Sequence, residues 1–219
     1  MLFRQSKRLK GVFQGSIRVT VWDDYRLLYV RVPKSGNSTI RRSIEHGVKR
    51  RMSKTQIIKL QDEWTTFSFV RNPWARMVSA FCHKAGNVSK SPRMVEGIYQ
   101  GFVDQGIAVR ADMGFEEFCE LICSIPDKKM DKHLCSQASF LIQNDAPIVP
   151  FIGKIECMAE DWARLMTPLG INTPARHINR TEKTHQHYSH FYKDTALVNL
   201  VGDRYAEDIR HFNYDFERR

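Results

Sequence analysis

The segment Leu27–Ile44, LLYVRVPKSGNSTIRRSI, is the part of the chain that decides its fold. An apolar run ends at Pro33, a short loop follows, and an amphipathic pattern begins directly after the loop. This order predicts a β-strand, a tight loop and the start of an α-helix. Backbone N–H groups at a helix start lack intrahelical partners and carry partial positive charge, so such a corner attracts anions.

The side chains of the loop strengthen the prediction of an anion site. Lys34 adds a full positive charge, and Ser35, Ser38 and Thr39 add hydroxyl donors. The Walker A pattern places its lysine after a second glycine, whereas here Lys34 precedes Gly36, the only glycine of the loop. An ordinary nucleotide P-loop is therefore not expected, and a plain strand-to-helix turn stays an alternative.

A second strand–loop–helix unit follows. Thr65–Val70, TTFSFV, is rich in β-forming residues and predicts a strand, and Pro73 suits the first turn of a helix. Arg71 at the strand end offers a bidentate guanidinium, and Ser79 offers a hydroxyl from two turns into the helix. Two such units predict an α/β fold in which ligand groups gather at the carboxyl ends of parallel strands.

The remaining segments predict a single domain over residues 1–219. Further strands are expected at Ile17–Val21 and Val149–Ile152, and helices at Phe115–Ile125, Met158–Leu169 and Asp194–Phe212. Ile40, Ile44 and Val48 fall four residues apart and indicate one apolar helical stripe, which makes the basic cluster Lys49-Arg50-Arg51 a solvated helix end. Residues 1–15 are expected to form a flexible basic arm, and residues 86–114 an insertion near the mouth of the site.

Composition limits the class of protein and of partner. The 219 residues are 42% hydrophobic and carry a net charge of +10, which allows a proper core and favours an anionic partner. Five scattered cysteines indicate free thiols in a reducing compartment. No apolar stretch is long enough to span a bilayer, and the N-terminus lacks the apolar centre of a secretory signal.

Several longer motifs resemble those of the sulfotransferases, in particular the carbohydrate-type branch, family 2. The loop Pro33–Thr39, PKSGNST, looks like the 5′-phosphosulfate-binding loop of that family, and Phe69–Phe81, FVRNPWARMVSAF, looks like its 3′-phosphate-binding segment. The likeness runs from about Leu27 to Phe216 and includes Asp131-Lys132-His133, Phe151–Glu156, Asp161, His177–Arg180, Tyr205, Asp208-Ile209 and Phe212.

This resemblance implies a three-layer α/β/α fold with a central, mainly parallel, P-loop-like sheet. It implies 3′-phosphoadenosine 5′-phosphosulfate (PAPS) as sulfate donor and adenosine 3′,5′-bisphosphate (PAP) as product. By the resemblance, the 5′-phosphosulfate is held by Pro33, Lys34, Ser35, Gly36, Asn37, Ser38 and Thr39, and the 3′-phosphate by Arg71 and Ser79. Animal members carry a membrane anchor that is not found here, so we expect a cytoplasmic, bacterial enzyme without an integral membrane segment.

The chemistry of sulfuryl transfer assigns two roles. Negative charge grows on the departing bridging oxygen, so a cation directed at that atom helps most in the transition state, and Lys34 is the candidate. An acceptor hydroxyl must lose its proton. His133 is the candidate base, with Glu63, Asp131 and Glu156 as other candidates. No metal ion is expected, because protein cations stabilise the leaving group.

Two other classes of function stay open at the level of sequence. A nucleotide-dependent kinase would need the Walker A order and acidic metal ligands at a strand end, and neither pattern is found. A basic nucleic-acid-binding module would explain the charge and would bind with a steep salt dependence. The sulfotransferase interpretation expects no nucleic acid, and its acceptor is a carbohydrate or another hydroxyl compound, recognised near residues 86–114 and 177–190.

Overall fold

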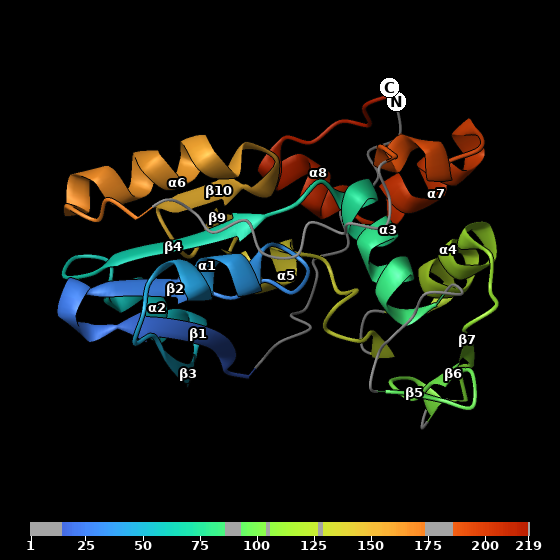
Figure 1. Ribbon diagram of the computed structural model, residues 1–219, viewed down its shortest axis with the longest axis horizontal. Coiled ribbons are helices and arrows are strands. Elements are labelled where there is room, and N and C mark those ends of the chain that lie inside the picture. Colours follow the sequence, from blue (N-terminus) through green and yellow to red (C-terminus); the bar gives the residue numbers. More distant parts are fainter. Residues whose placement is uncertain (1–14, 86–92, 104–105, 127–128, 174–185, 219) are drawn as a thin grey trace.

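The computed structural model describes residues 15–85, 93–103, 106–126, 129–173 and 186–218. Its central feature is a five-stranded sheet with the strand order β10-β4-β2-β1-β3 (Figure 1). The strands are β1 (Ile17–Trp22), β2 (Leu27–Val30), β3 (Val48–Met52), β4 (Thr65–Val70) and β10 (Phe151–Lys154). Strands β10, β4 and β2 run parallel, whereas β1 is antiparallel to both β2 and β3.

The sheet is therefore mixed, which corrects the prediction of a mainly parallel one. The short 3₁₀ turn η1 (Asp23–Tyr25) joins β1 to β2, and Arg26 closes it in the left-handed conformation. A connection this short permits only an antiparallel hairpin, because a parallel crossover needs a dozen or more residues. The parallel part is confined to the three strands whose carboxyl ends lead into the candidate site.

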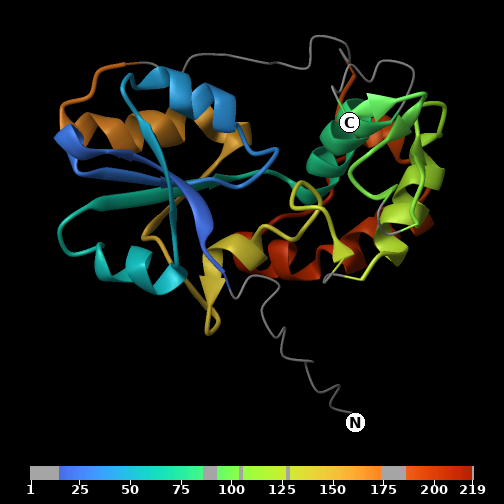
Figure 2. The same ribbon diagram turned by 90° about the horizontal axis from the view of Figure 1, so that it is seen from below.

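The alternation of side chains along the strands builds two separate cores. Tyr29 of β2 and Phe67 of β4 stack with ring centroids 5.1 Å apart, on the face covered by α1 (Asn37–Ser43) and α6 (Met158–Met166). The opposite face packs against α2 (Lys54–Lys59) and α5 (Ala138–Leu141). Figure 2 shows α1 and α6 on one side of the sheet and α2 and α5 on the other.

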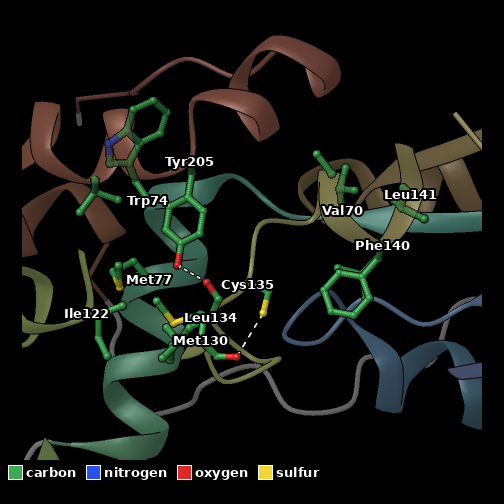
Figure 3. Close-up of a cluster of buried hydrophobic side chains, with 14 of the residues drawn as sticks. Val70, Trp74, Met77, Ile122, Met130, Leu134, Cys135, Phe140, Leu141 and Tyr205 are labelled. Carbon is green, nitrogen blue, oxygen red and sulfur yellow. Dashed lines mark hydrogen bonds between the residues drawn. The ribbon is translucent and has the colours of Figure 1, made fainter. Parts of the chain in front are cut away.

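A helical half lies beyond the carboxyl end of β4. It contains α3 (Pro73–Lys84), α4 (Phe115–Ser124), α7 (Thr195–Arg204) and α8 (Ala206–Phe212) (Figure 1). The core of this half continues the core on the α2 face, and in it the Tyr205 hydroxyl donates to the carbonyl oxygen of Leu134 at 2.8 Å (Figure 3). The helix expected over Asp194–Phe212 is thus two helices, which meet at Tyr205.

Short elements complete the described chain. They are the strands β5 (Met94–Val95), β6 (Ile98–Tyr99), β7 (Val109–Arg110), β8 (Ile142–Gln143) and β9 (Ala146–Pro147), and the 3₁₀ turns η4 (Ile155–Cys157), η5 (Thr167–Leu169) and η6 (Tyr188–Phe191). Strands β5, β6 and β7 form a small sheet within the predicted insertion 86–114. Residues 1–14 of the predicted arm lie outside the described residues.

The single helical stripe expected from Ile40 to Val48 is wrong. Helix α1 ends at Ser43, His46 adopts a left-handed conformation with φ of 62°, and Val48 begins β3. The Trp22 ring packs so closely on Gly47 that a Cβ atom there would lie 2.7 Å from the ring. The basic cluster at residues 49–51 is consequently part of an exposed edge strand, where charges discourage pairing with another chain.

Candidate functional site

The loop between β2 and α1 has the tight geometry that the sequence predicted. Lys34 and Gly36 both adopt left-handed conformations, with φ of 69° and 74°. For lysine this conformation costs on the order of 1 kcal/mol, and such strain persists where the surrounding structure enforces it. Asn37 provides part of that enforcement, because its Nδ2 donates to the Val32 carbonyl oxygen and its Oδ1 accepts from the Tyr29 hydroxyl, both at 2.8 Å.

One cavity of about 720 Å³ opens at this loop. Of the residues proposed from sequence, it is lined by Pro33, Lys34, Gly36, Asn37, Ser38, Thr39, Arg71, Ser79 and His133. The cavity therefore brings together the loop after β2, the end of β4, the outer face of α3 and the segment before α5. The two cationic strand ends open into the same space.

Ser35 is the one member of the loop whose side chain turns away from the cavity. Its side chain is fully buried, and its hydroxyl donates to Oε1 of Gln137 at 2.8 Å. The same Oε1 accepts from the backbone N–H of Arg71, and Nε2 of Gln137 donates to the carbonyl oxygen of Arg71. Gln137 thus joins the two strand ends directly and fixes their spacing, and Ser35 does not line the cavity.

Arg76, whose role the sequence left open, is a buried structural cation. Its Nε donates to the carbonyl oxygen of Pro33 at 3.1 Å, and its Nη2 donates to that of His133 at 3.2 Å. Arg76 therefore links the lysine-bearing loop to the segment that carries the candidate base. Because it also adds charge behind the cavity, it raises the positive potential there.

The electrostatics of the cavity favour an anion. Burial, together with the charges of Arg71, Lys84 and Arg76, lowers the pKa of Lys34 to about 8. Burial is also the main cause that lowers the pKa of Arg71, although Glu156 opposes it. Both groups stay protonated at neutral pH, although burial and like charges make the charged forms less stable. An anion bound between Lys34 and Arg71 would offset this loss of stability.

His133 has the surroundings of a general base. Its Nδ1 lies 2.8 Å from Oδ1 of Asp131, and its backbone N–H donates to the same oxygen. A carboxylate at Nδ1 favours the tautomer that leaves Nε2 as the proton acceptor. The hydrogen bond to Asp131 raises the pKa of His133, but burial and the charges of Lys84 and Lys132 outweigh it and lower the pKa below its usual value.

The other three candidate bases are less suitable. Asp131 is occupied by His133, whose hydrogen bonds hold the pKa of this carboxyl low although burial acts to raise it. Glu156 accepts from the Asn72 N–H and the Tyr214 hydroxyl at 2.7 and 3.0 Å. Glu63 is exposed and does not line the cavity.

Several residues that line the cavity were not among the site residues predicted from sequence. Arg18, Arg31, Arg51 and Lys132 line the cavity, as does His83, whose pKa is lowered to about 4 by burial and the nearby cations. In the described part of the chain, Nε of Arg31 has no hydrogen-bond partner. Arg18 and Arg51 gave no local signal of a site, because only the pairing of β1 with β3 places them opposite each other.

The comparisons with known proteins agree with the motifs. The family model described as the sulfotransferase family matches residues 18–215, which is nearly the whole chain. No curated protein and no solved structure matches the chain significantly. Among the described residues, every helix is too short or too polar to cross a membrane. The chain belongs to sulfotransferase family 2.

Proposed function

We propose that this protein transfers a sulfuryl group from PAPS to a hydroxyl group of a carbohydrate. The observation that carries the proposal is the pair of cationic strand ends, Lys34 and Arg71, on one cavity. Their separation is held by Gln137, which hydrogen-bonds to both loops. A ligand with two anionic ends, such as an adenosine with a 3′-phosphate and a 5′-phosphosulfate, matches this arrangement.

The residues present fit such a donor. Lys34 and the loop Gly36–Thr39 would hold the 5′-phosphosulfate, and Arg71 with Ser79 would hold the 3′-phosphate. The cavity of about 720 Å³ leaves room for an acceptor beside the donor. In this proposal the sheet with helices on both faces is the three-layer, P-loop-like fold of the family, with a loop that lacks the Walker A order.

The donor supplies an activated sulfuryl group, whose bond to the bridging phosphate oxygen breaks as a bond to the acceptor oxygen forms. Lys34 stabilises the charge that develops on the bridging oxygen. His133 takes the proton of the acceptor hydroxyl at Nε2, while Asp131 holds the ring through Nδ1. Arg71 and Ser79 keep the donor in line, so most of their contribution is to positioning.

The acceptor is best described as a carbohydrate with an anionic substituent. Once the donor occupies Lys34 and Arg71, the cavity still presents Arg18, Arg31 and Lys132. Burial, followed by the charges of Arg41 and Arg18, lowers the pKa of Arg31, so like charges lie near this cation. A carboxylate or sulfate on the acceptor would offset that repulsion.

The test is a transfer assay with sulfur-labelled PAPS and a panel of neutral and acidic oligosaccharides. The wild type should label acidic acceptors, and Lys34→Ala should lose activity by several orders of magnitude while it stays folded. Arg18→Ala should raise KM for the acceptor and leave the dissociation constant of PAP unchanged. Wild-type turnover by Lys34→Ala would end the assignment of its role, and equal labelling of neutral acceptors would reject the anionic class.

A further inference from the structure

Lys84, at the last turn of α3, is a fully buried lysine that the proposed mechanism does not use. Its Nζ donates to the hydroxyl of Tyr99 at 2.5 Å and lies 3.4 Å from Oδ1 of Asp131. Tyr99 belongs to β6 and is also buried. A buried ammonium is costly unless it is paired and hydrogen-bonded, so this contact has to be maintained for the segment to stay packed.

The same carboxylate oxygen serves both Lys84 and His133. Oδ1 of Asp131 faces Nδ1 and the backbone N–H of His133, each at 2.8 Å, and the ammonium of Lys84. The Asp131 side chain is only 8% exposed, so water contributes little to its orientation. The backbone N–H of His133 and the ammonium of Lys84 therefore set together the direction in which Asp131 presents its charge to the imidazole.

We propose that Lys84 is a positioning residue for His133, which acts by holding Asp131 against Nδ1, and that Tyr99 connects this network to the small sheet β5–β6–β7. The inference rests on the proposed role of His133 in sulfuryl transfer. It assigns a task to the insertion: its buried tyrosine fixes the lysine that orients the base. Three side chains, those of Tyr99, Lys84 and Asp131, thus connect this sheet to the base.

The charges around His133 give the network a measurable signature. The imidazole is influenced by Asp131, which raises its pKa, and by the cations of Lys84 and Lys132, which lower it. His83 of α3 also faces this group, and Arg76 binds the His133 carbonyl oxygen. Replacing Lys84 by a neutral residue removes one of the groups that lower the pKa, so His133 should titrate at a higher pH.

The experiment compares wild type with Lys84→Gln, whose side chain is one atom shorter but still donates hydrogen bonds, and carries no charge. Two readouts are the pH profile of kcat/KM and the NMR titration of the His133 ring, identified by its absence in His133→Ala. We expect the acid limb and the ring titration to move up by about half a unit to one unit, with kcat reduced about tenfold. The dissociation constant of PAP should stay unchanged.

Lys54→Gln is the matched control, because Lys54 is a partly buried lysine whose Nζ donates to the Ile142 carbonyl oxygen, away from His133. The inference would be overturned if the His133 ring in Lys84→Gln titrated at the same pH as in the wild type. An equal shift of this titration in Lys54→Gln would overturn it too. If Lys84→Gln does not fold, Tyr99→Phe removes only the hydroxyl that Lys84 binds, and an unmoved titration there would overturn it as well. The NMR readout needs no turnover, so failure of this inference and failure of the proposed function are distinguishable.

Discussion

The charged Lys34 is largely buried in the cavity, which lowers the free energy of unfolding. Lys34→Met should therefore make the ligand-free protein more stable. The pKa of Lys34 falls from 10.5 to about 8, mainly through burial. At 1.36 kcal/mol for each pKa unit, the charged form destabilises the folded state by about 3 kcal/mol at pH 7. Methionine has a similar length and carries no charge, so the variant avoids this cost.

The sign of the pH dependence follows from linkage. Between pH 8 and 10.5 the unfolded chain binds a proton at Lys34 that the folded protein has released, so the wild-type stability rises with pH through this window. Below about pH 8 the full cost is present. The advantage of Lys34→Met should therefore be up to about 3 kcal/mol at pH 7 and fall below about 1 kcal/mol at pH 10.

Urea unfolding at the two pH values, with and without PAP, measures this effect. Lys59→Met, on the exposed face of α2, is the control for replacing a lysine by methionine. PAP at one hundred times its dissociation constant should add about 2.7 kcal/mol to the wild type and clearly less, at the same concentration, to Lys34→Met. The reasoning is refuted if Lys34→Met is no more stable than wild type at pH 7, or if its advantage is the same at pH 10.

Three further predictions concern neighbouring parts of the site. Gln137→Leu should lower the free energy of unfolding, measured in urea, by about 2–3 kcal/mol, because the hydroxyl of Ser35 and the backbone of Arg71 lose buried partners. An unchanged free energy of unfolding would contradict the link between the loops. Gly153→Ala should lower the thermal midpoint, because its new methyl group overlaps the Phe69 ring at a cost of about 1–3 kcal/mol, and a wild-type midpoint would count against this packing. His133→Ala should abolish the acid limb of the kcat/KM profile without changing PAP binding measured by calorimetry, and a retained limb would remove His133 as the base.

Local sequence was sufficient to predict those elements in which a single pattern of residues dominated. The strand Thr65–Val70 was predicted with its observed bounds, because a run of β-forming residues is closed by a proline that can only begin the next helix. Gly170 ends the predicted helix near residue 169 in the left-handed conformation, as a glycine at that position should. The loop at Lys34 was also found, since its residues are adjacent in sequence.

The features that the sequence did not predict depend on tertiary contacts. Strand β3 was missed because its side chains are exposed on both faces, so an edge strand leaves no alternation to detect. Gln137 gave no local signal, because its partners Ser35 and Arg71 lie 102 and 66 residues away. The same holds for Arg51, which lies opposite Arg18 at the cavity only through the pairing of β1 with β3.

The central claim is that Arg71 and Lys34 hold the two anionic ends of one adenosine ligand. Calorimetry with PAP and with adenosine 5′-monophosphate, which lacks the 3′-phosphate, tests it in the wild type, Arg71→Ala and Lys34→Ala. The wild type and Lys34→Ala should bind PAP more tightly than the monophosphate, and Arg71→Ala should bind the two alike. A preference for PAP that survives in Arg71→Ala, or its absence from the wild type, would contradict the account.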